Sequence, residues 1–335
     1  MAAKVARPGP GCRFRRDFAS RLTPLGNSAL RTSRISCTSN WIARHFARRV
    51  PPEGGGSGTG VVNTERNGLI DYGRFMAALG IVWFNAQAPG DRIAYIALPF
   101  FLVLLALPST SSLSARARRL LQPFLIWSVI FAMLNTALSL KTNSPPFDWW
   151  RWSMLLSGTW VHLWFLPFAF LTAVVAPWLR HPLASLGGAI LMASILALHG
   201  SPKPVPFGQW AFAVIPVLVG IAYFSWGWRL AVTTLLTSSL ILFLGPPSPD
   251  NVTILFGSVI GLVFLSNHLP ATAVSDWCAR ISYWVYLAHP LVIIVAQSLR
   301  ITYIELALVS VVGSVMLAQI IETSVQASRK GKLEF

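Results

Sequence analysis

Long apolar runs alternate with short polar connections from residue 69 almost to the end of the chain. Most runs reach or approach the about 20 residues that a helix needs to cross a bilayer, and a helix satisfies its backbone polar groups within one segment. The pattern predicts an all-α, polytopic membrane helix bundle with about ten transmembrane helices. The expected segments are 69–86, 93–108, 120–140, 160–179, 183–199, 209–224, 229–245, 252–266, 281–298 and 301–321.

Residues 1–66 have a different composition. They lack a continuous apolar run, are rich in Arg, Ser and Pro, and include the stretch PPEGGGSGTG. Such a segment is expected to be a disordered basic N-terminal tail with a Gly-rich linker, and it lacks the apolar core of a secretory signal. A dispensable or mis-assigned start, contact with the membrane surface, and targeting all stay open as its origin. The transmembrane domain is expected over 67–325, followed by a basic C-terminal tail, 326–335.

Charge supports the membrane interpretation and excludes a nucleic-acid surface. Apolar residues make up 54% of the chain and charged residues 11%, with a net charge of +16. Residues 1–50 alone hold eleven Lys and Arg against one acid. Elsewhere nine basic residues fall on the side expected inside and five on the side expected outside, which favours two cytoplasmic termini and contact with anionic membrane lipid. The three cysteines have no ligand spacing, so no metal site is expected.

The first apolar segment carries Asp71, Arg74 and Asn85. Arg74 and Asn85 are eleven residues apart, so on a helix they share one face, separated by about 16 Å of rise. Polar groups inside a membrane helix are costly and usually serve a function, which makes this face a candidate site. A structural alternative stays open, in which Arg74 reaches the nearer headgroups and Asn85 caps the helix.

Three arginines precede the third segment in RARRLLQPFLIW. Arg116 and Arg119 could bind the phosphates of a cytosolic anionic molecule, because guanidinium groups make forked, charge-assisted hydrogen bonds. The alternative is a positively charged anchor on the cytoplasmic side of the membrane.

Two histidines lie in later segments. His162 opens the fourth segment in WVHLWFLP, and His289 lies in the ninth in SYWVYLAHP. Histidine is suited to proton transfer near neutral pH, and the expected topology puts His162 and Asn85 near the same, outer level. A structural role among aromatic residues stays open for His162. His289 precedes Pro290, which frees a backbone carbonyl, so His289 could simply satisfy a helix kink.

Together these stretches resemble the acyltransferase-3 family, integral membrane O-acyltransferases that modify bacterial surface and exported polysaccharides. The resemblance rests on DYGRFMAALGIVWFN, RARRLLQPFLIW, HLWFLP and ISYWVYLAHPLV, and it covers nearly everything after the tail. It implies a multi-pass protein of the bacterial inner membrane that takes an acyl group from acyl-CoA, such as acetyl-CoA. The acceptor would be a hydroxyl of a polysaccharide or of its lipid-linked precursor.

The resemblance also suggests roles for individual residues. Arg74 matches a family arginine, and Asn85 stands where the family has a histidine needed for activity. A carboxamide has no usable basicity, so His162 is the best remaining candidate for proton transfer. Arg116 and Arg119 would bind the CoA phosphates. Two alternatives remain: an inactive relative that binds saccharide or CoA, and a transporter or flippase.

Overall fold

The computed structural model describes residues 66–108, 111–200 and 206–331, which belong to one compact unit of the chain. The described part is all-α, apart from an isolated bridge between Asn67 and Pro270. This confirms the predicted fold class. The helices are α2 (Gly68–Asn85), α3 (Asp91–Ala94), α4 (Ala97–Leu104), α5 (Leu113–Lys141), α6 (Met154–Ser157), the 3-10 helix η1 (Val161–Trp164), α7 (Phe165–Leu179), α8 (Pro182–His199), α9 (Phe207–Trp226), α10 (Trp228–Leu244), α11 (Pro249–Ser266), α12 (Ala273–Ser298) and α13 (Tyr303–Gly331).

Seven helical segments in the described residues are long and apolar enough to cross a membrane: α5, η1 with α7, α8, α9, α11, α12 and α13. The protein is therefore a multi-pass membrane protein. Helix α10 is apolar but has only 17 residues. Helix α2 has 18 residues and is less apolar, because it carries Asp71, Arg74 and Asn85.

The second expected segment, 93–108, is not one continuous helix. It contains the end of α3 and then α4, whose eight residues extend for about 12 Å, far less than a bilayer core of about 30 Å. Most of α4 is buried, and it packs between α9 and α11. Irregular backbone at membrane depth is tolerated where protein covers it. A hydropathy pattern alone does not distinguish such a buried helix from a span.

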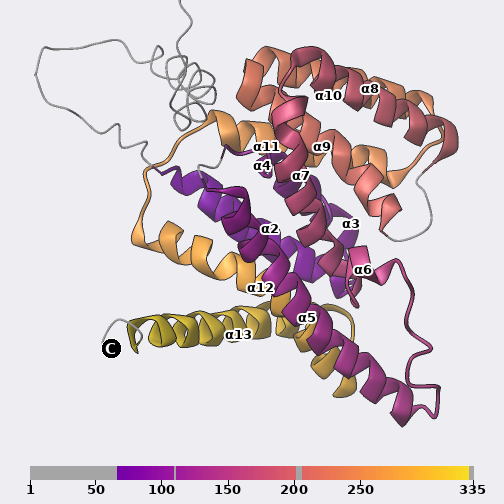
Figure 1. Ribbon diagram of the computed structural model, residues 1–335, viewed down its shortest axis with the longest axis vertical. Helices are drawn as coiled ribbons and strands as arrows, with labels where there is room; N and C mark the ends of the chain where they lie inside the picture. The colour runs from indigo at the N-terminus through magenta and orange to yellow at the C-terminus, as the bar shows by residue number, and fades with distance from the viewer. Residues whose placement is uncertain (1–65, 109–110, 201–205, 332–335) are drawn as a thin grey trace, which may run out of the picture. The chain divides into compact units, whose positions relative to one another are not determined.

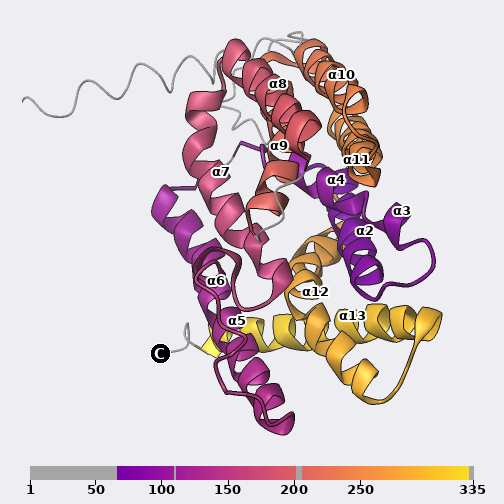
Figure 2. The same cartoon turned by 90° about the vertical axis from the view of Figure 1, so that its right-hand side faces the viewer.

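The helices pack in two neighbouring groups. Helix α12 packs against both α2 and α13, while α8, α9 and α10 pack against one another. Figure 1 shows α8 and α10 at the top of the helical region, with α13 well below them and the last turns of α5 at the bottom, and Figure 2 shows the same separation from the side. Helix α4 approaches α9 closely, because a Cβ at Gly220 would overlap the carbonyl oxygen of Val103.

Hydrogen bonds join the start of α2 to the loop before α12. The Asn67 side chain donates to the carbonyl of Asn267 (2.8 Å), and the Gly68 amide donates to the carbonyl of Leu269 (2.8 Å). Residues 1–65 of the expected tail lie outside the described residues. At the other end, α13 continues to Gly331, into the region expected as the C-terminal tail.

Candidate functional site

A buried carboxylate organises the first turns of α2. Asp71 is 2% exposed, and its Oδ2 lies 2.7 Å from Nε of Arg66. Arg66 also contacts Asp276 of α12 through Nη1 (2.7 Å), and Nη1 of Arg74 lies 3.8 Å from Oδ1 of Asp71. A buried carboxylate is costly unless cations compensate it. The two arginines supply that compensation, and Arg66 also links α2 to α12.

Arg74 and Arg119 interact electrostatically, although 45 positions separate them in the sequence. Arg74 lies on α2 and Arg119 near the start of α5, and their guanidinium groups interact unfavourably as like charges. The Tyr283 hydroxyl of α12 donates to the backbone carbonyl of Arg119 (3.4 Å), which holds α5 at this position. Two neighbouring cations form an electrostatic setting that an anion would stabilise.

Arg116 and Arg119 are separated by about one turn of α5, as the RxxR spacing predicts. The Ser112 side chain caps the helix by accepting from the Ala115 amide (3.2 Å). Arg116 donates through Nε to Oγ of Ser111 (3.3 Å), so its side chain is partly engaged by the residues before the helix. In the first turns of α5, Arg116 is half-buried and Arg119 is exposed.

His162 is buried in η1, with 5% of its surface exposed. Its ring contacts Phe131 of α5 and both Tyr286 and His289 of α12, with centroid separations of 5.5, 5.6 and 5.1 Å. The Tyr286 hydroxyl donates to the backbone carbonyl of His162. These contacts bring the HLWFLP and YLAHP motifs together inside the bundle.

His289 satisfies the kink that Pro290 introduces into α12. Proline lacks an N–H, so the carbonyl four residues earlier, that of Tyr286, loses its helical partner. Nδ1 of His289 fills that place at 2.7 Å. This contact confirms the structural role considered for His289 from the sequence. What the sequence did not reveal is its contact with His162, because no local signal couples positions 127 residues apart.

Asn85 is half-buried at the end of α2. Its amide donates to the Ile81 carbonyl of the same helix (2.8 Å). The neighbouring Phe84 stacks on Tyr95 at a centroid distance of 4.3 Å, and Tyr95 in turn stacks on Phe212. Helix α2 is unbroken between Arg74 and Asn85, so the shared face predicted from their spacing holds geometrically.

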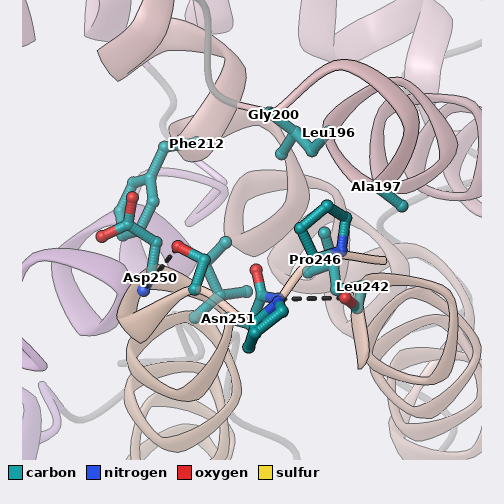
Figure 3. A pocket seen from close by; sticks show the side chains of 11 residues that line it. Leu196, Ala197, Gly200, Phe212, Leu242, Pro246, Asp250 and Asn251 are labelled. Carbon is teal, nitrogen blue, oxygen red and sulfur yellow. Dashed lines mark hydrogen bonds between the residues drawn. The ribbon is translucent and has the colours of Figure 1, made fainter. Parts of the chain in front are cut away.

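A separate pocket of about 200 Å³ lies where α8, α9, α10 and α11 end or begin (Figure 3). Figure 3 shows the Asp250 carboxylate beside the Phe212 ring and the Asn251 amide bonded to the Leu242 carbonyl (3.0 Å). None of the five residues predicted to form the site lines this pocket. Within the described residues no group of three metal-ligating side chains occurs.

The HLWFLP and YLAHP motifs are therefore in contact. Helix α12 also connects the arginine cluster of α5 with His162. Tyr283 and Tyr286 are three residues apart, about one helical turn. Tyr283 bonds the backbone of Arg119, and Tyr286 bonds the backbone of His162. Adjacent turns of one helix thus hold the arginine cluster and the buried histidine.

Comparison with known proteins gives one match, over most of the chain. A family model described as an acyltransferase domain matches residues 67–323. The matched region contains all ten expected segments and every predicted site residue. No curated protein and no solved structure matches the chain.

Proposed function

Because the chain belongs to the acyltransferase-3 family of membrane acyltransferases, we propose that it transfers an acetyl or other short acyl group from acyl-CoA to a saccharide hydroxyl. The acceptor is a surface or exported polysaccharide, or its lipid-linked precursor. The observation that supports this most strongly is the pair of tyrosines one turn apart on α12, whose hydroxyls donate to the backbone carbonyls of Arg119 and His162. The reaction needs both an anion-binding cluster and a proton-transfer group, and α12 contacts both.

Arg116 and Arg119 bind the phosphates of the acyl-CoA donor in this proposal. Their separation of about one helical turn lets both face one ligand. Arg74 lies near Arg119 and orients the donor or stabilises negative charge that develops on the carbonyl oxygen. The negatively charged phosphates of acyl-CoA would relieve the repulsion between these guanidinium groups, so the charge of the site favours this donor.

The chemistry requires one proton to move. The acceptor oxygen bonds to the thioester carbon, the C–S bond breaks, and the hydroxyl proton passes through His162 to the departing sulfur. Asn85 does not act as the base, because its amide has no usable lone pair on nitrogen. It contributes by polarising a carbonyl oxygen.

A second candidate function is binding without catalysis. One observation favours it. Asn85 stands where the family resemblance expects a histidine, and its amide donates a hydrogen bond to the Ile81 carbonyl of its own helix. In that case the arginine cluster would still bind CoA, or the bundle would bind saccharide, and no acyl group would be transferred.

The site requires a defined orientation in the membrane. We place the protein in a bacterial inner membrane with both termini and Arg116 in the cytoplasm, as the distribution of Lys and Arg favours. Single cysteines introduced at Ser114 and Ser144 of a cysteine-free chain should then react from opposite sides of the membrane. Labelling of both from outside intact cells would contradict this orientation.

Binding of labelled CoA tests the donor site. Arg116→Ala combined with Arg119→Ala should weaken CoA binding tenfold or more, since a charge-assisted hydrogen bond is worth about 1.5–3 kcal/mol. Arg118→Ala, which removes an exposed arginine between them, is the matched control and should bind nearly as the unaltered protein does. Equal CoA affinity for the double variant and the control would remove the arginines from the donor site.

A further inference from the structure

His162 and His289 form a buried pair of imidazoles. Their ring centroids are 5.1 Å apart, and the residues are 5% and 0% exposed. The rings of Phe131 and Tyr286 pack beside His162 at 5.5 and 5.6 Å. Because an aromatic enclosure offers little hydrogen bonding, each imidazole is an available polar partner for the other.

The backbone determines which nitrogen of His289 carries its hydrogen. Nδ1 of His289 lies 2.7 Å from the carbonyl oxygen of Tyr286, the group that Pro290 leaves without a helical donor. A carbonyl can only accept, so Nδ1 carries the N–H of the neutral ring. Nε2 is then an acceptor with a free lone pair, and it makes no hydrogen bond in the described part of the chain.

His162 has the complementary requirement. Neither of its ring nitrogens has a partner at hydrogen-bond geometry within the described ranges, although the backbone of Leu287 interacts with the ring. A neutral imidazole always carries one N–H, and a buried N–H without an acceptor costs free energy. The Nε2 lone pair of His289 is an acceptor within reach of His162 after a rotation of the His162 ring about χ2, since the two rings are already in contact and the His289 ring stays bonded to Tyr286.

We propose that His289 is a positioning residue for acyl transfer: its Nε2 accepts the N–H of His162 and so fixes the tautomer of His162. Two hydrogen bonds then follow one another: His289 Nδ1–H donates to the Tyr286 carbonyl, and the N–H of His162 donates to His289 Nε2. The other nitrogen of His162 is left as a lone pair for the acceptor hydroxyl. A base oriented by a second group is a common arrangement in nucleophilic catalysis.

This inference rests on the proposed function and adds a direction to its proton transfer. His162 takes the hydroxyl proton on its free nitrogen and becomes an imidazolium, which still donates to Nε2 of His289. As the oxygen bonds to the thioester carbon and the C–S bond breaks, His162 returns a proton to the sulfur and CoA leaves as the thiol. Both histidines are then neutral again, and no other reactant is consumed.

Two substitutions separate positioning from the structural role of His289. His289→Gln puts an amide oxygen near the place of Nε2 and keeps an acceptor for His162, but loses the bond to Tyr286. His289→Asn puts an amide near the place of Nδ1 and keeps that bond, but no longer reaches His162. His199→Gln, at an exposed histidine of α8, is the matched control.

In the transfer assay we expect His289→Asn to lower kcat at least tenfold with little change in KM for acetyl-CoA. His289→Gln should retain more activity than His289→Asn. The reverse order, with the asparagine variant active and the glutamine variant inactive, would overturn the proposal in favour of a purely structural histidine.

Nitrogen NMR of the full chain in lipid bilayers, labelled with ¹⁵N-histidine, tests the same inference without turnover. We expect His289 to carry its hydrogen on Nδ1, and the ring signals of His162 to shift in His289→Asn but not in His199→Gln. A hydrogen on Nε2 of His289, or ring signals of His162 that stay unchanged in His289→Asn, would overturn the proposal. Inactivity of the unaltered protein would contradict the proposed function and leave this spectroscopic result to stand by itself.

Discussion

Removing the Arg66 guanidinium should destabilise the protein by about 1–3 kcal/mol. Arg66 is the closest cation to Asp71, at 2.7 Å, whereas Arg74 is 3.8 Å away, and the Asp71 side chain is only 3% exposed. Loss of one partner from a buried ion pair costs about 3–5 kcal/mol. The expected value is smaller, because Arg66 is half exposed to solvent and Arg74 remains beside the carboxylate.

Unfolding of the full chain in detergent micelles, followed for a set of variants, measures this effect. Asp71→Asn introduced into Arg66→Ala should recover much of the lost stability, because the neutral amide no longer needs a cation. Asp276→Asn is the matched control: it removes the negative charge from the other Arg66 contact, at a 41% exposed side chain, and should cost less than about 0.5 kcal/mol. A truncated chain that starts at Asn67 should show the same loss as Arg66→Ala. An Arg66→Ala variant as stable as the unaltered protein, or a further loss of stability when Asp71→Asn is added, would contradict the role of Arg66 as the partner of Asp71.

Two other substitutions test the function and the packing. Asn85→His should create or raise acetyl transfer to saccharide, since a positioned base contributes about 10²–10⁴-fold; a folded variant without gain, together with activity that survives His162→Ala, would contradict the assigned roles. Gly220→Ala should destabilise the bundle by about 1–3 kcal/mol in detergent unfolding, because the new methyl group meets the backbone of α4. Gly187→Ala, at an exposed position of α8 with open space around it, should be neutral or stabilising, and equal effects at the two glycines would refute the close approach.

The sequence predicts those features that depend on a local pattern of residues. Apolar runs of membrane length predicted the all-α bundle, because the bilayer imposes helices and sets their length. The same logic misjudged residues 93–108, since a short helix buried by its neighbours is as apolar as a span. Burial by protein and burial by lipid leave the same hydropathy signal.

Contacts between distant segments were beyond the reach of local patterns. No local pattern relates Arg74 to Arg119, and only the fold lets them interact as like charges. Arg66 fell at the last position of the expected tail, and no pattern revealed that it pairs with Asp71 and Asp276. His289 was interpreted through Pro290 alone, which explains its Nδ1 contact with Tyr286 and leaves out the pairing of its ring with His162.

The central claim is that this membrane protein moves an acyl group from CoA to a saccharide hydroxyl. The most direct measurement gives acetyl-CoA labelled in the acetyl group to membranes containing the protein, and then examines the polysaccharide and lipid-linked saccharide fractions. We predict alkali-labile, ester-linked label that depends on the protein and falls in the Arg116→Ala, Arg119→Ala double variant. A correctly inserted protein that binds CoA but leaves both saccharide fractions unlabelled would contradict the claim and favour a binding protein without catalysis.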